Sequence, residues 1–308
     1  MKKFVIRLGA FLLLSSIAYG VLVFAWQNTG YKRFKGNINY RIGTYGNMYT
    51  RVREIPQFHD VDVLFLGSSH AYRGFDTRIF EAEGYRSFNL GSSSQTPIQT
   101  KALLSRYLAV LNPKVVVYEV YPNTFCGDGV EASTDVIAND VNDWSSVRML
   151  WDSRNAKVLN TWIYASIRDL FDLNGDFIEP LIKPESRDTY ISGGYVEKEV
   201  YFYSKKSYLA NHWSFNEKQV EEFESVLDML EKKSIKTYLV FNPISSEFYK
   251  SYDNRQEFDQ WMSGYGSYYN FNETISLNDS LHFYDSNHMN QDGVEIYNQI
   301  LVRLLRKD

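Results

Sequence analysis

Short apolar stretches alternate with helix-like segments along most of the chain, and this alternation constrains the fold more than any other feature. Strands are expected at 61–66, 86–90, 114–120, 235–241 and 281–284, with helical segments at 76–82, 97–111, 214–233, 245–262 and from 294 onward. The stretch "KVVVYEV" at 114–120 is uninterrupted and β-branched, as is typical of a strand covered on both faces. The alternation therefore predicts an α/β fold, with a parallel sheet between two layers of helices.

Small and polar residues follow the first three expected strands. Ser69 lies in "GSSH" after the first strand, Gly91 in "NLGSS" after the second, and Asn123 in "YPN" after the third. Near the C-terminus, "DSNH" places Asp285 and His288 just after the short strand expected at 281–284. Ligands of parallel sheets bind beyond the carboxyl ends of the strands, so we expect these side chains to converge at one edge.

A serine, a histidine and an aspartate are the parts of an acyl-transfer site. Ser69 would be the nucleophile, His288 the base that takes its proton, and Asp285 the carboxylate that orients the imidazole. The backbone N–H groups of Ser69 and Gly91 and the amide of Asn123 are candidate donors to the oxyanion.

Structural roles compete with each of these assignments. The serine hydroxyls of "GSSH" are also suited to capping a turn, and Asp285 to capping the last helix. Gly91 can serve only to allow a positive φ, and Asn123 can be a turn residue after Pro122.

The four segments together resemble the blocks of the SGNH (GDSL-like) hydrolases over about 61–123 and 214–308. The resemblance implies a three-layer flavodoxin-like fold and a double displacement through an acyl-serine, with no metal or other cofactor. Carried onto this chain, it makes Ser69, Asp285 and His288 the catalytic residues, and Ser69, Gly91 and Asn123 the oxyanion hole. Two positions depart from the family pattern. Ser68 replaces the usual Asp, a change similar to that in the membrane-anchored, DltD-like branch associated with acyltransferases, and Thr124 follows Asn123 where the family has Asp.

The N-terminus is expected to be a membrane anchor. Lys2, Lys3 and Arg7 lie in a short segment, 1–7, that precedes an uncharged apolar run at 8–26. That run is close to the length needed to cross a bilayer, and Trp26 suits the interface. A cleaved signal peptide is the alternative, because "AYG" at 18–20 resembles a cleavage site.

An uncleaved signal anchor would place residues 1–7 in the cytoplasm and the domain outside it. The asymmetry of positive charge supports this orientation, although Lys32, Arg33 and Lys35 weaken it. Residues 27–60 would form a juxtamembrane stalk that packs onto the domain at 61–308.

Residues 126–213 interrupt the alternation and are interpreted as an insertion in that domain. It should hold an amphipathic helical stretch near 147–170 and a hairpin around 192–194. His212 and Trp213 at its end, and His70 beside the nucleophile, are candidates for lining the substrate site. Glu119, in a buried strand, is expected to be paired, with Arg73 as a possible partner.

Composition excludes several classes of function. The net charge of −4 without a long basic run argues against nucleic acid as a partner. The single Cys126 and five scattered histidines have no metal-ligand spacing, so no metal site is predicted.

The sequence thus predicts a membrane-anchored serine esterase or O-acyltransferase. Its expected substrates are acyl esters, with acetyl the expected group, of an extracytoplasmic glycan or envelope polymer. A membrane-bound O-acyltransferase is a possible partner. The alternative is a non-catalytic envelope protein that binds glycan or docks such an acyltransferase through the same cleft.

Overall fold

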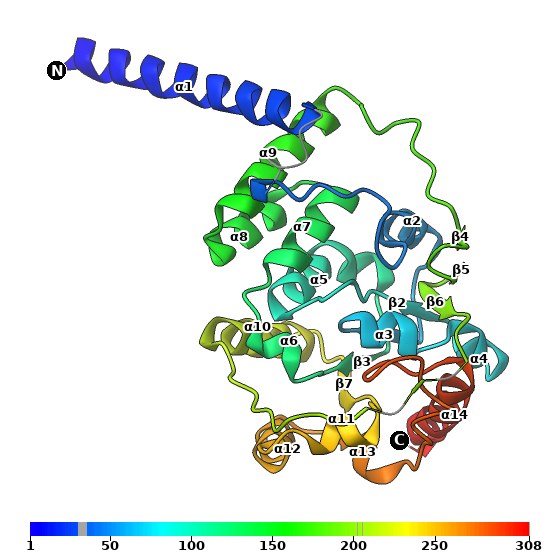
Figure 1. Ribbon diagram of the computed structural model, residues 1–308. Helices are drawn as coiled ribbons and strands as arrows, with labels where there is room; N and C mark the ends of the chain where they lie inside the picture. Colours follow the sequence, from blue (N-terminus) through cyan, green and yellow to red (C-terminus); the bar gives the residue numbers. More distant parts are fainter. Residues whose placement is uncertain (30–35, 202, 205, 308) are drawn as a thin grey trace.

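The centre of the molecule is a five-stranded sheet whose neighbouring strands all run parallel (Figure 1). The computed structural model describes residues 1–29, 36–201, 203–204 and 206–307. In spatial order the strands are β2 (Ser87–Asn89), β1 (Val63–Leu66), β3 (Val115–Glu119), β7 (Lys236–Phe241) and β8 (Tyr268–Asn270). This is the flavodoxin-like order 2-1-3-4-5: β2 is added on one side of β1, and the later strands are added on its other side, so the switch point lies between β1 and β3.

Helices cover both faces of the sheet, because successive strand residues point to opposite sides. Leu64 and Leu66 share one hydrophobic cluster with residues of α5 (Pro97–Leu111), α10 (Glu217–Glu231) and α12 (Arg255–Ser263). Val63 and Phe65 share the other with residues of α3 (Ser69–Gly74), α4 (Thr77–Ala82), α13 (Phe271–Thr274) and α14 (Gln291–Lys307). The predicted three-layer α/β/α fold with a parallel sheet is confirmed.

Four local predictions were wrong. Residues 281–284 form no strand; the last strand of the sheet is β8, which was not anticipated. The stretch 245–262 is two helices, α11 (Ser246–Lys250) and α12. The helix expected from 214 begins at Glu217 as α10, and its cap is Asn216, whose side chain accepts from the Lys218 N–H. The stretch 147–170 lies in two helices, because Arg154 takes a left-handed φ of 45° between them.

A short helix, α6 (Asn123–Cys126), leads into the insertion. The described residues of the insertion form three helices, α7 (Val130–Asn139), α8 (Trp144–Ser153) and α9 (Ala156–Leu170), and a small antiparallel sheet. The sheet has strands β4 (Ile182–Lys183), β5 (Asp188–Ile191) and β6 (Tyr195–Lys198), and β5 and β6 form the predicted hairpin. Arg73 of α3 donates to both carboxylate oxygens of Asp188, at 2.8 and 3.1 Å, and so joins this sheet to the main domain. The predicted pairing of Arg73 with Glu119 is therefore wrong.

The N-terminal segment is one long helix, α1 (Lys2–Asn28), which leaves the domain beside α9 (Figure 1). It is long and apolar enough to cross a membrane, and a signal sequence can also have this length and composition. Residues 30–35 of the predicted stalk, including Lys32, Arg33 and Lys35, lie outside the described residues. Further on, α2 (Met48–Glu54) and the short 3-10 helix η2 (Ile55–Gln57) pack against the domain.

Candidate active site

Ser69, His288 and Asp285 form a continuous chain of contacts at the carboxyl edge of the sheet. The Ser69 hydroxyl lies 2.8 Å from Nε2 of His288, which is hydrogen-bond distance. On the other side of the ring, Nδ1 lies 2.9 Å from Oδ2 and 3.1 Å from Oδ1 of Asp285. Ser69 lies 219 positions before His288 in sequence, and the fold brings it to the Asp285–His288 turn.

The turn after β1 places Ser69 at the first position of helix α3. Gly67 has φ of +137°, and a Cβ at this position would lie 2.6 Å from Oε2 of Glu119, so only glycine fits. Ser68 caps the helix by accepting a hydrogen bond from the His70 N–H. The Ser69 hydroxyl and its backbone N–H consequently lie at a helix N-terminus, where the first N–H groups have no intrahelical acceptor.

The Asp285 carboxylate is held by its own turn. Oδ1 accepts from the backbone N–H groups of Asn287 and His288 at 2.9 and 2.8 Å. Burial raises the pKa of Asp285, but these N–H groups and the His288 ring outweigh burial and hold the pKa below its usual value. The carboxylate is therefore ionised at neutral pH, as a partner for an imidazolium must be.

Two aromatic rings flank the His288 imidazole and fix its plane. The Tyr284 ring is stacked at 5.4 Å and the His70 ring at 4.7 Å between centroids, with interplanar angles of 2° and 14°. Burial, together with the charge of the neighbouring His288, lowers the pKa of His70 well below its usual value. A neutral His70 can pack against His288 without repelling the imidazolium that would form there.

Glu119, at the end of β3, lies directly under the nucleophile turn. Its Oε2 accepts from the backbone N–H and the hydroxyl of Ser68, at 3.2 and 3.1 Å. Burial raises the pKa of Glu119 to about 8, in spite of these bonds. At neutral pH the side chain is therefore a neutral acid.

This pKa predicts that the folded chain loses stability as the pH rises. Unfolded Glu119 titrates near 4.5, whereas the folded state keeps the proton to about pH 8. Between these values the folded state binds one more proton, so the free energy of unfolding falls by up to about 1.4 kcal/mol per pH unit. Glu119→Gln cannot titrate and should lack this part of the slope, as measured by urea unfolding at pH 5.5, 6.5 and 7.5.

Asp135 of α7 provides a parallel variant, because burial also raises its pKa to about 8. Asp135→Asn should flatten the same curve by a similar amount. Slopes that are equal in the wild type and in Glu119→Gln would show that Glu119 is ionised in the folded chain.

The three expected oxyanion donors are not equally placed. Ser69 and Asn123 both line the cavity beside His288. The Asn123 amide donates to the Tyr121 and Tyr252 hydroxyls at 3.0 and 3.5 Å, so it must exchange one of these bonds to reach an oxyanion. The Gly91 N–H instead donates to Oδ1 of Asn89 at 3.1 Å, so it already has an acceptor.

The cavity has a volume of about 390 Å³, and most of the residues that line it have polar side chains. It lies between the nucleophile turn, the loop after β2, the loop after β3 and the Asn287–His288 turn. Its polar lining residues are Ser68, Ser69, His70, Ser94, Thr96, Tyr121, Asn123, Thr124, Asp128, Glu131, Asn287 and His288.

His70 borders this cavity, but His212 and Trp213 do not lie there. Trp213 is buried in the core and stacks on Tyr252 at 4.1 Å between ring centroids. His212 is exposed on the surface, where its Nδ1 lies 2.7 Å from Asp253. The prediction that His212 and Trp213 line the site rested on residue type alone. Their position after a polar loop does not reveal that Trp213 is a core residue.

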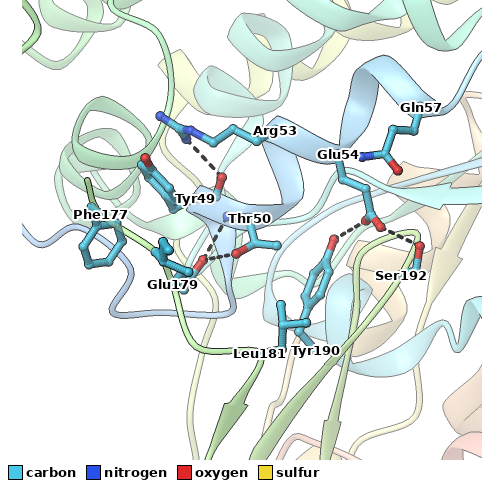
Figure 2. Close-up of a pocket in the computed structure, with 11 residues that line it drawn as sticks. Tyr49, Thr50, Arg53, Glu54, Gln57, Phe177, Glu179, Leu181, Tyr190 and Ser192 are labelled. Carbon is cyan, nitrogen blue, oxygen red and sulfur yellow. Dashed lines mark hydrogen bonds between the residues drawn. The ribbon is translucent and has the colours of Figure 1, made fainter. Parts of the chain in front are cut away.

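A second hollow of about 500 Å³ lies between α2, η2, β5 and the loop before β4 (Figure 2). Figure 2 shows Glu54 accepting from Tyr190 and Ser192, and Glu179 accepting from Thr50. Both carboxylates therefore have partners within the protein. The Ser69–His288–Asp285 chain lies elsewhere, so we place the candidate active site at the smaller cavity.

Sequence reasoning did not find the contact between Glu119 and Ser68. An acidic residue inside an apolar strand, "VVVYEV", was the available signal. Tyr118 is paired with Leu66, the last residue of β1, so Glu119 lies one residue further on, beside the turn at Gly67, and reaches Ser68.

Comparisons with known proteins give remote likenesses to solved structures, among them two crystal structures. No family model matches the chain, and no curated protein matches it. A crystal structure described as an acylhydrolase of Bacteroides fragilis is 13% identical, with a TM-score of 0.45, over 86% of this chain and 98% of that one. A GDSL-like lipase of Bacteroides thetaiotaomicron is also 13% identical, with a TM-score of 0.45, over 85% and 98%. Because both likenesses are remote, we infer the reaction from the atoms of the site itself.

Proposed function

We propose that the chain is a membrane-anchored, SGNH-type serine esterase or O-acyltransferase. The single observation that carries the proposal is the 2.8 Å contact between the Ser69 hydroxyl and an imidazole that Asp285 orients from its other side. A serine hydroxyl becomes a competent nucleophile when a base of this kind takes its proton.

In the first half of the reaction, Ser69 Oγ attacks the acyl carbonyl while Nε2 of His288 takes the hydroxyl proton. The Nδ1 proton of the resulting imidazolium faces the Asp285 carboxylate, which stabilises the positive charge. The Ser69 N–H and the Asn123 amide donate to the oxyanion. His288 then gives its proton to the leaving oxygen, and the acyl group remains on Ser69.

In the second half, water or a hydroxyl of an acceptor attacks the acyl-serine. His288 takes the proton of the attacking oxygen and returns it to Ser69 Oγ as the ester bond breaks. Attack by water makes the chain an esterase, and attack by an acceptor hydroxyl makes it an acyltransferase.

Most of the residues that line the cavity have polar side chains, which supports a hydrophilic substrate. Val130 and Ala132 are the aliphatic side chains among the lining residues, and Asp128 and Glu131 face the same space. Together with the apolar helix α1, this favours acetyl esters of a glycan or envelope polymer outside the cytoplasm. A membrane-bound O-acyltransferase remains a proposed partner.

One observation favours a non-catalytic protein that binds glycan or docks an acyltransferase. The Gly91 N–H is bonded to Asn89, and the oxyanion would need this N–H if it requires three donors. In such a protein the same cavity would hold the ligand without cleaving it.

A fluorophosphonate probe separates the two functions. An activated serine attacks the phosphorus of the probe and displaces fluoride, so the purified chain should gain the mass of one probe molecule less that of HF. Binding of an acetylated glycan without labelling would favour the non-catalytic protein. If labelling occurs, comparing acetate release in water with acetyl transfer to a sugar acceptor distinguishes esterase from transferase.

A further inference from the structure

The outer end of the anchor helix is not free of the domain but packs along α9. The Tyr19 hydroxyl donates to Asn160 at 2.6 Å, and the Phe24 ring stacks on Tyr164 at 5.5 Å. Ile163 and Ile167 come within 4 Å of the position that a Cβ on Gly20 would occupy. The last three turns of α1 therefore share an interface with α9.

This interface limits how α1 can cross a membrane. The uncharged run is 8–26, and Arg7 bounds it on the N-terminal side. Residues 8–18, which precede the contact with α9, are exposed and span only about 16 Å at about 1.5 Å per residue. The hydrocarbon core of a bilayer is about 30 Å thick. A complete span consequently needs residues 19–26 as well, and α9 must accompany them to the depth of the outer leaflet.

Two leucines of α9 are exposed, together with Ala156 and Asp169, where this placement would bring the helix to lipid. Leu159 and Leu170 are 11 positions apart and so share a face, next to the face that packs on α1. Leu170 is 78% exposed, and Phe171, just after the helix, is 66% exposed.

The neighbouring helix α8 adds two tryptophans. Trp144 and Trp151, seven positions apart, share a helix face and are 80% and 75% exposed. Tryptophan is enriched at the boundary between lipid headgroups and acyl chains. Figure 1 shows α8 and α9 on the part of the domain from which α1 departs.

We infer that α9, with α8 beside it, forms a membrane seat embedded in the outer boundary of the bilayer. The seat consists of Trp144, Trp151, Leu159, Leu170 and Phe171. This inference rests on the proposed membrane anchoring and adds a second, monotopic contact to it. The domain then has a fixed orientation relative to the lipid surface and does not rotate freely about its anchor. The cavity beside Ser69 has a fixed orientation as well.

Depth measurements at single cysteines test the seat. Cys126 is replaced by Ser in the full-length chain, and Leu170→Cys, Phe11→Cys and Leu209→Cys each receive an environment-sensitive fluorophore. Phe11 lies within the proposed span, and Leu209, 88% exposed on a loop at the end of the insertion, is the matched apolar control. The proteins are reconstituted in phosphatidylcholine–phosphatidylglycerol vesicles, with and without a doxyl-labelled lipid.

The label at 170 should be quenched by the doxyl lipid at least twofold more than the label at 209, and be protected from aqueous iodide. Trp151→Cys and Phe171→Cys should behave like Leu170→Cys, and either replaces it if that variant does not fold. If the doxyl lipid quenches the label at 11 while iodide reaches the label at 170, the membrane seat is wrong but the anchoring by α1 stands. Protection from iodide at 170 without lipid quenching would also overturn it, in favour of a protein partner or a second copy. Absence of quenching at 11 would instead show that the anchoring itself is wrong.

Discussion

Replacing Ser69 by alanine is expected to lower kcat/KM for a small acetyl ester by at least ~10³-fold and to abolish fluorophosphonate labelling. The variant keeps the cavity, the donors and the base, but it has no oxygen to form the acyl intermediate. Ser69 begins α3 and Ser68 provides its cap, so the fold should be retained. Initial rates, intact-protein mass after probe treatment and thermal unfolding would be measured on the same preparation.

Ser68→Ala is the matched control, one position away. The Ser68 hydroxyl contacts Glu119 and the His70 ring rather than His288, so this variant should still be labelled. Loss of the cap should cost about 1 kcal/mol of stability. Labelling that survives Ser69→Ala but disappears in Ser68→Ala would show that Ser68, and not Ser69, is the nucleophile.

Asp285→Asn should reduce kcat by about 10⁴-fold with little change in fold. The asparagine oxygen can still accept from the Asn287 and His288 N–H groups, which preserves the turn. Its NH₂ group would then face Nδ1 of His288 and favour the tautomer that carries the proton on Nε2. That nitrogen could no longer take the proton of Ser69. Single-turnover acylation rates report this step directly.

The surface offers a control for Asp285→Asn. Asp253 contacts His212 through Nδ1 at 2.7 Å, the same type of carboxylate–imidazole pair, but in an exposed position. Asp253→Asn should leave the acylation rate within a factor of two of the wild type. If Asp285→Asn retains more than a tenth of the wild-type rate, Asp285 does not orient the base.

The sheet was predictable because its inner strands bury nearly every residue. Val63–Leu66 and Val115–Glu119 read as apolar runs in sequence, and both form strands within two residues of the predicted bounds. β8 escaped prediction because Tyr268–Asn270 is only three residues long and half-buried at the sheet edge. Residues 281–284 have strand-like composition, but only Phe283 pairs, in an isolated bridge with Met289.

The sheet topology made it predictable that the site residues lie at one edge, but not which contacts they make there. Parallel strands deliver their carboxyl ends to one edge, so Ser69 and Asn123 had to approach each other. The contacts that decide function depend on tertiary packing: the Gly91 N–H bonded to Asn89, and Glu119 bonded to Ser68. Residue type alone also could not distinguish Trp213, a core residue, from a ligand-binding aromatic.

Arg51 gives the segment before the first strand a role that a tether would not have. Its buried guanidinium donates to the carbonyls of Gly46, Gly91 and Gly194, and so joins α2 to the loop after β2 and to the β5–β6 hairpin. Because Gly91 lies in the loop that borders the candidate site, a displacement of residues 36–57 would be transmitted to that loop through Arg51. A soluble version of the domain should accordingly begin ahead of residue 36, since a chain that starts at 61 would lack Arg51 and leave the carbonyls of Gly91 and Gly194 without their donor.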